Sequence, residues 1–166
     1  MDTRTRCFGT GGTTVPIEEN KQLVRAVIEE ALNKGNVDVA DEYFSPDYVA
    51  HIPRAPETPP GPMKFKLVIA MWRTAFEDWH MTIEDLIAEG DYVVNRFTTR
   101  GTHTGPLMGI PPTGRKIEVR GIEMHRIVDG KVVESWIADD IPSILVQLGV
   151  LEMPRMQAPR PAAPAQ

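Results

Sequence analysis

The spacing of apolar residues changes once along this chain, near Trp79, and this change limits the fold more than any other feature of the sequence. Before it, apolar residues recur every three or four positions, which is the spacing of one face of an amphipathic helix. After it, apolar and polar residues alternate in segments separated by turn residues, which is typical of β-strands. Helices followed by an antiparallel meander predict an α+β fold in which the helices pack on one face of the sheet.

The predicted elements follow from this pattern and from the glycines and prolines that interrupt it. Helices are expected at about residues 17–34, 36–44, 63–79 and 141–148. Strand-like segments are expected at about residues 80–90, 91–105, 115–130 and 131–140. The third helix is apolar on most sides, so we expect it to be largely buried.

Length and composition indicate one domain that binds a small molecule. The 166 residues are 42% hydrophobic and suit a single core, which we place at residues 15–152, with disordered tails at 1–14 and 153–166. A net charge of −5 argues against nucleic acid or membrane as a partner and favours a hydrophobic small molecule. The single cysteine, Cys7, gives no disulfide, and no signal or membrane-spanning run is found, so a soluble cytoplasmic protein is expected.

The Asp129-Gly130 pair predicts a two-residue turn, and this turn fixes which side chains of the last two strands share a face. With regular pairing, Val128 lies opposite Lys131 and Ile127 opposite Val132. One face then carries Glu123, His125, Ile127, Val132, Glu134, Trp136 and Asp140. The other face carries Ile122, Met124, Val128, Val133 and Ile137.

The face with the titratable groups has two interpretations. It is either a solvated outer surface or the polar part of a cavity between sheet and helices, and Trp136 favours the cavity. Of the two consecutive aspartates, alternation turns only one inward, and regular pairing selects Asp140. A carboxyl group at the edge of an apolar cavity has a raised pKa and suits a general base, whereas helix capping would explain either aspartate without catalysis.

The segment GTHTGPLMGIPPTGR, residues 101–115, places a histidine where a strand enters a loop rich in glycine and proline. His103 shares a face with Phe97, so it is a candidate site residue or a hydrogen-bonded structural histidine. His51 ends a short extended segment and could border the same cavity. No spacing of His, Cys or carboxylates predicts a metal, and neither a dinucleotide fingerprint nor a GxSxG motif is present, so no cofactor is expected.

Several separated motifs together resemble the SnoaL-like polyketide cyclase family. They are GTHTGPLMGIPPTGR, DGKVVESW, Trp136 followed four residues later by Asp140, and QLG at residues 147–149, with YVAHIP and DWHMTIEDLIAEGD upstream. The resemblance covers roughly residues 17–151. It implies the nuclear-transport-factor-2-like fold, in which a strongly curved antiparallel sheet and about three helices form a cone with a deep apolar pocket.

Characterised members that this sequence resembles close the last ring of an aromatic polyketide by an intramolecular aldol condensation, without metal or cofactor. The resemblance therefore implies a cyclase with Asp140 as the catalytic acid/base, and His103 or His125 could steady the enolate oxygen. The other residues expected to contact the substrate are His51, Trp72, Phe97, Met124 and Trp136.

Two other functions remain open on the same fold. An epoxide hydrolase would need two carboxylates and an arginine around one water, with Asp139 and Arg96 or Arg126 as candidates. A binding protein without catalysis would use only the pocket. In each case the apolar face with Ile122 and Met124 would need to be covered, so we expect a homodimer that packs through the sheets, unless that face is the core.

Overall fold

The computed structural model describes residues 17–53 and 59–152. The tails predicted at 1–14 and 153–166 lie outside the described residues, so both stay predictions. In the part of the chain that is described, no helix is both long and apolar enough to cross a membrane.

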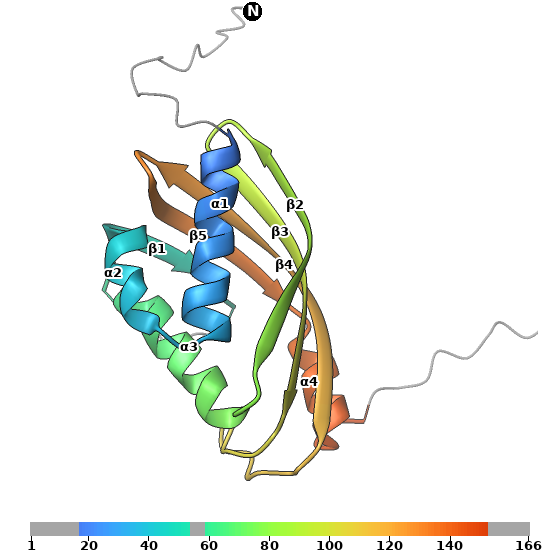
Figure 1. Ribbon diagram of the computed structural model, residues 1–166. Coiled ribbons are helices and arrows are strands. Elements are labelled where there is room, and N and C mark those ends of the chain that lie inside the picture. The colour runs from blue at the N-terminus through green and yellow to red at the C-terminus, as the bar shows by residue number, and fades with distance from the viewer. Residues whose placement is uncertain (1–16, 54–58, 153–166) are drawn as a thin grey trace, which may run out of the picture.

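Helices fill most of the N-terminal half and strands most of the C-terminal half, as the sequence predicts (Figure 1). The first half consists of α1 (Ile17–Val27) with a π-helical extension (Ile28–Asn33), a 3-10 turn (Val37–Val39), α2 (Ala40–Tyr43), β1 (Phe44–His51) and α3 (Met63–Ala75). The second half consists of β2 (His80–Glu89), β3 (Tyr92–Thr102), β4 (Lys116–Val128), β5 (Lys131–Asp139) and α4 (Ile141–Leu148). The last helix ends at Gly149, whose φ of 77° fits the left-handed position after a helix.

The five strands form one sheet in the order β1-β5-β4-β3-β2. Strands β2 to β5 form the predicted antiparallel meander, and the α+β class is confirmed. Strand β1 differs from the expectation because it pairs parallel with β5, which makes the sheet mixed. The sequence gives no local sign of this pairing, since more than half of the domain lies between β1 and β5.

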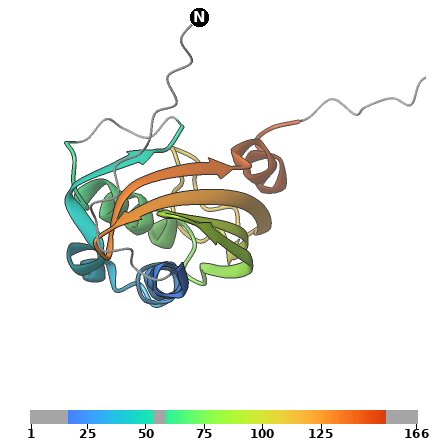
Figure 2. The same ribbon diagram turned by 90° about the horizontal axis from the view of Figure 1, so that it is seen from above.

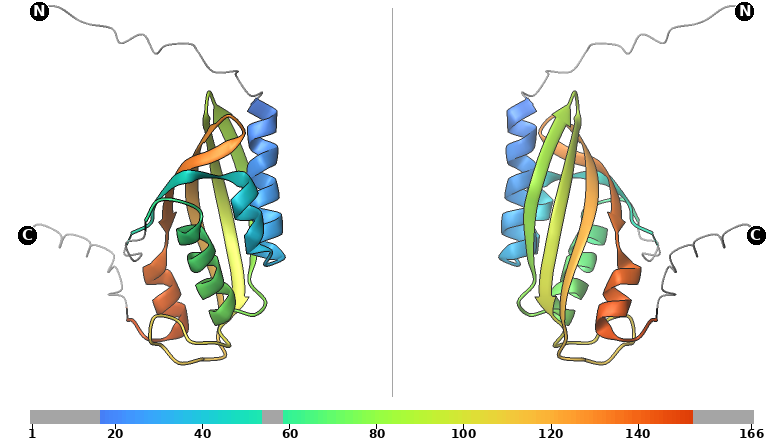
Figure 3. Two further views of the ribbon diagram at one scale, coloured as in Figure 1. Left: turned by 90° about the vertical axis from the view of Figure 1, so that its left-hand side faces the viewer. Right: turned by 90° about the vertical axis from the view of Figure 1, so that its right-hand side faces the viewer.

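The sheet curves strongly, and α1, α2 and α3 lie on its concave side (Figure 2). Helix α4 lies at the end of the sheet far from α1 (Figure 3). The buried apolar side chains form two groups, one between α1 and the sheet and one where α3, β4 and α4 meet. A hollow remains between these groups.

A β-bulge in β5 changes which side chains face this hollow. Ile127 pairs with Val132 as predicted, but Arg126 pairs with Glu134, so Val133 has no partner on β4. One extra residue in a strand reverses the face of every residue after it. The predicted pairing is therefore correct before the bulge and wrong after it: Trp136 and Asp140 do not share the face of Glu123 and His125, whereas Ile137 and Asp139 do.

Candidate active site

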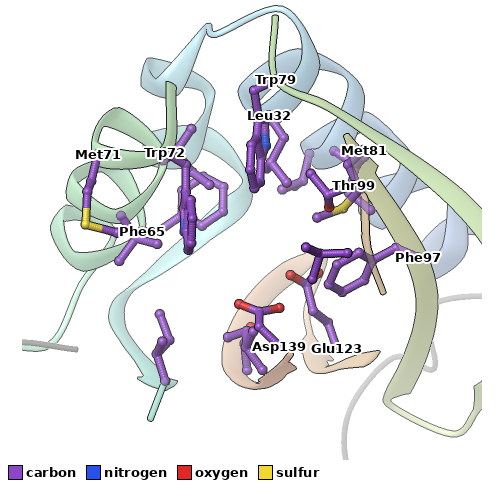
Figure 4. Close-up of a pocket in the computed structure, with 18 of the residues that line it drawn as sticks. Leu32, Phe65, Met71, Trp72, Trp79, Met81, Phe97, Thr99, Glu123 and Asp139 are labelled. Atoms are coloured by element: carbon purple, nitrogen blue, oxygen red, sulfur yellow. The ribbon is translucent and has the colours of Figure 1, made fainter. Parts of the chain in front are cut away.

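A cavity of about 510 Å³ lies between the sheet and the helices (Figure 4). This volume is within the range of pockets that hold small organic ligands. Its walls are mostly apolar and come from α1, α3, the sheet and α4. Among the residues that form them are Ile28, Leu32, Phe65, Trp72, Trp79, Met81, Phe97, Val119 and Ile144.

Two carboxyl groups project into this apolar space, those of Asp139 from β5 and Glu123 from β4. Figure 4 shows them on the same side of the cavity. Burial and, as the smaller cause, the nearby charge of Glu123 together raise the pKa of Asp139 to about 7. Asp139 is thus half-protonated near neutral pH and can both accept and donate a proton.

Next to the two carboxyl groups, His125 belongs to the polar part of the cavity wall. We call this part the cavity floor; it consists of Tyr48, Glu123, His125, Ser135 and Asp139. The Nδ1 of His125 lies 2.8 Å from the Ser135 hydroxyl, and its Nε2 lies 3.5 Å from Oε2 of Glu123. Tyr48 also lines the cavity, and burial raises the pKa of its phenol, which therefore stays protonated. The floor thus presents groups that can accept, donate and relay protons.

Gly121 allows an aromatic ring to lie beside Asp139. In the sheet, Phe97 pairs with Gly121, and Gly121 pairs with Asp139. A Cβ atom at Gly121 would overlap the Phe97 ring, so this ring extends across the glycine toward Asp139. The ring occupies the space that a side chain at position 121 would otherwise fill.

The placement predicted for Asp140 is wrong. Its side chain is exposed and accepts a hydrogen bond from the backbone N–H of Ser143 at 3.0 Å, so it is the N-cap of α4. The reason is the bulge at Val133, which gives the inward position to Asp139. Helix capping, the other role that the sequence allows for either aspartate, is therefore the role of Asp140.

His103 shares the buried face of β3 with Phe97, as predicted, but it lies outside the cavity. Its Nδ1 accepts a hydrogen bond from the backbone N–H of Thr113, which leaves the ring proton on Nε2. Burial lowers the pKa of the ring, so it is neutral. His103 therefore holds the two ends of the loop together, and the expectation that it faces the reacting group is wrong.

Three predicted contact residues lie on the outer face of the sheet. Trp136 stacks on His51 with ring centres 5.1 Å apart, and Nε2 of His51 lies 2.9 Å from a carboxylate oxygen of Glu134. Met124 pairs with Trp136 and lies in the same shallow outer groove. The bulge turns Trp136 outward, and His51 lies beside it because β1 pairs parallel with β5. Met124 lies on the face that the predicted register gave it, opposite that of His125, so it does not reach the cavity.

The other three predicted contact residues, Trp72, Phe97 and His125, do line the cavity. Sequence reasoning missed the inward role of Asp139 and did not single out Glu123, although the register had placed Glu123 beside His125. It also missed Trp79 and Tyr48, because nothing in a single sequence shows which buried aromatic residues border a hollow.

The outer face is partly apolar, with Ile122 half-exposed. Ile137, predicted for this face, lines the cavity as well. A homodimer through the outer face stays a prediction. Within residues 17–53 and 59–152, no group of three or more His, Cys or carboxylate side chains is arranged to hold a metal ion.

Comparison with known proteins identifies relatives of this arrangement. The model of the SnoaL-like polyketide cyclase family matches residues 22–148. A nogalonic acid methyl ester cyclase of Streptomyces nogalater is 33% identical over 120 residues, which cover 72% of this chain and 90% of that protein. An aklanonic acid methyl ester cyclase of Streptomyces peucetius is 34% identical over 133 residues, which cover 76% of this chain and 88% of that protein.

Solved structures agree with these matches. TsrD from Streptomyces laurentii superposes with a TM-score of 0.74 and 31% identity, over 82% of this chain and 99% of that one. IdmH from Streptomyces antibioticus gives a TM-score of 0.69 and 35% identity, over 79% of this chain and 99% of that one. Together with the family model, these similarities show that the chain belongs to the SnoaL-like polyketide cyclase family.

Proposed function

We propose that this protein closes a ring of a flat, uncharged polyketide by an intramolecular aldol-type condensation, with Asp139 as the general acid/base. The observation that carries the proposal is the position of the Asp139 carboxyl group, in an apolar cavity and with a pKa raised to about 7. Membership of a family of polyketide cyclases supports the reaction class.

The reaction needs one group that takes a proton and returns it. Asp139 in its ionised form removes a proton from a carbon between two carbonyl groups. The resulting enolate carbon attacks a carbonyl carbon of the same molecule, a C–C bond forms, and the former carbonyl oxygen takes the proton from Asp139. Atoms and charge balance without another reactant, and Asp139 returns to its starting state.

The cavity favours this step in two ways. Its apolar walls fold and hold the chain of the substrate, so that the two reacting carbons meet without loss of further rotational freedom. His125 and the protonated Tyr48 phenol are donors on the same floor, where they can steady the negative charge on the enolate oxygen.

The charges of the cavity favour a substrate without a free carboxylate. Glu123 and Asp139 are both acidic, and no lysine or arginine is among the described residues that form the walls. An anionic substrate would meet like charge in a medium of low dielectric constant, which is unfavourable. The relatives from S. nogalater and S. peucetius are named for methyl esters, in which that charge is masked, and we propose a similarly esterified substrate here.

The test compares Asp139→Asn with Asp140→Asn, because the two aspartates are neighbours and differ in where they point. Loss of a positioned base should lower kcat of Asp139→Asn by about 100-fold or more, measured with the nogalonic acid methyl ester substrate of the relative. Asparagine is also a good N-cap, so Asp140→Asn should keep nearly full activity. Equal turnover by the two variants would refute a role of Asp139 in proton transfer.

The two alternative functions receive less support. Arg96 pairs with Asp85 at 2.6 Å, and Arg126 pairs with Glu134 at 3.2 Å, so neither arginine joins the carboxyl groups of the cavity as an epoxide hydrolase would require. A protein that only binds its ligand would gain nothing from an acidic group with a pKa near 7. Tight binding of the ester without turnover by the wild type would favour this last function.

A further inference from the structure

Two hydrogen-bonding groups in the cavity wall lack partners. The indole nitrogen of Trp79 and the hydroxyl oxygen of Thr99 are buried and make no hydrogen bond, although both residues line the cavity. Trp79 is 8% exposed and Thr99 is 2% exposed. A buried polar group without a partner is destabilising, so its presence needs an explanation. Asn20, Asn95 and His103 also have unpartnered atoms, but these three residues do not line the cavity.

Both groups are held in fixed positions. The backbone of Met81, which pairs with Thr99 in the sheet, is bonded to the side chain of Asn33 at 2.8 and 3.1 Å. The Trp79 ring stacks on Trp72 with centres 5.0 Å apart. Arg73 donates to the carbonyl oxygens of Leu32 and Asn33, which fixes the end of the π-helix against α3. Groups held this rigidly can bind a ligand atom with little loss of conformational entropy.

The two groups lie away from the carboxyl side of the cavity. Thr99 is two residues along β3 from Phe97, and Asp139 is two strands across from Phe97 in the same cross-strand row. Strand spacing and rise per residue put Thr99 and Asp139 about 12 Å apart along the sheet. Figure 4 shows Trp79 across the cavity from Asp139 and Glu123, and Thr99 between them on the sheet side, next to Met81. A fused polycyclic compound spans such a distance, whereas a single ring does not.

We propose that Trp79 Nε1 and Thr99 Oγ1 form a subsite for an oxygen atom, a ring carbonyl of the substrate remote from the carbon that Asp139 deprotonates. The indole nitrogen can only donate, and the hydroxyl can donate by rotation, so each group would be satisfied by a hydrogen-bond acceptor of the substrate. This inference rests on the proposed function for the class of substrate, a flat carbonyl compound. The subsite would fix which end of the substrate lies at Asp139 and so which ring is closed.

The experiment uses binding and needs no turnover. Fluorenone and fluorene are flat, uncharged tricyclic compounds that differ by one carbonyl oxygen, and their dissociation constants are measured by calorimetry. Wild-type protein should prefer fluorenone, and Thr99→Val and Trp79→Phe should each reduce this preference by about two- to tenfold, the usual effect of one neutral hydrogen bond. The affinity of Thr99→Val for fluorene should stay unchanged, because valine has nearly the same shape as threonine.

Thr99→Ser is the matched control, since it keeps the hydroxyl group and should keep the preference for fluorenone. If either variant binds too weakly or folds too poorly to measure, the other one carries the test. Equal affinity of the wild type for the two compounds, or an unchanged preference in both Thr99→Val and Trp79→Phe, would overturn the subsite. Asp139→Asn separates this result from the proposed reaction, because it should abolish turnover and leave the preference for fluorenone intact.

Discussion

At the scale of single residues, two carboxyl groups share one cavity, and the charge of Glu123 contributes to the raised pKa of Asp139. The proposed mechanism needs Asp139 ionised, so kcat/KM should rise as the pH increases through about 7. Replacing Glu123 by glutamine removes a negative charge that raises the pKa of Asp139. The acidic limb of the pH–rate profile of Glu123→Gln should therefore move to lower pH, while the limb of Asp140→Asn stays in place.

This prediction fails if the acidic limb of Glu123→Gln coincides with that of the wild type. The profile distinguishes an electrostatic role of Glu123 from a structural one, because damage to packing would lower the rate at every pH without moving the limb. Burial is the larger cause of the raised pKa, so the limb should remain above the usual range of an aspartate.

Gly121 offers a second test at this scale. A methyl group there would overlap the Phe97 ring and lie 3.0 Å from the carbonyl oxygen of Ala138. Gly121→Ala should lower the free energy of unfolding by about 1–3 kcal/mol, as overpacking of a core does, and should reduce turnover because the ring moves beside Asp139. Urea denaturation and steady-state kinetics measure the two effects.

A smaller residue at position 97 relieves the overlap. The double variant Gly121→Ala/Phe97→Leu should therefore regain part of the free energy of unfolding that Gly121→Ala loses. A loss of free energy of unfolding in the double variant equal to the sum of the two single losses would contradict this contact.

Residue patterns predicted the composition of the site better than its geometry. Alternation along β3 placed Phe97 correctly, and alternation along β4 placed Glu123 and His125 together. The choice between Asp139 and Asp140 failed, because it depended on the pairing of β5 beyond Val133. A bulge arises from the fit of whole strands, and a single sequence contains no local sign of it.

At the scale of elements, the loop that follows β3 is fastened to α3 by backbone contacts. The backbone N–H groups of Thr104 and Gly105 both donate to the carbonyl oxygen of Ala75 at 3.0 Å. A Cβ atom at Gly105 would overlap the Thr74 carbonyl, and this backbone atom cannot move aside as a side chain could. The close approach requires glycine at this position.

Gly105→Ala should therefore lower the free energy of unfolding by about 2 kcal/mol or more, measured by urea denaturation. Gly109→Ala in the same loop is the matched control: it has open space around it and a φ of 82°, so it should lose only about 1 kcal/mol to backbone strain. Similar losses in the two variants would show that the loop is not held against α3 through Gly105.

The sequence predicted the helices and the meander because each of them has its own period of apolar residues. It predicted a short extended segment that ends at His51, but it missed the pairing of this segment as β1, since the partner strand β5 comes much later in the chain. It also did not predict the π-helical extension of α1, which places Ile28 and Leu32 in the cavity wall.

At the scale of the whole molecule, the proposed acid/base has a cost in stability that depends on pH. The pKa of Asp139 is about 7 in the folded protein and near 3.9 in an unfolded chain, so the folded state binds more protons between these values. The contribution of the Asp139 carboxyl group to the free energy of unfolding is present in full below about pH 4 and is lost as the pH rises through 7.

Asp139→Asn should therefore be more stable than the wild type at pH 8, by about 2–4 kcal/mol, and about equally stable at pH 4. Urea denaturation at the two pH values measures the difference. A constant difference between Asp139→Asn and the wild type at both values would show that the carboxyl group is not desolvated in the folded protein.

The bulge at Val133 has one further consequence for an enzyme that carries two consecutive aspartates. If β5 absorbed the extra residue and paired regularly with β4, Ala138 would lie opposite Gly121, and Asp140, two residues further along, would turn to the cavity face in place of Asp139. The two consecutive aspartates therefore keep a carboxyl group on the cavity face in either pairing of β5. With Asp140 turned inward, however, α4 would lose its N-cap.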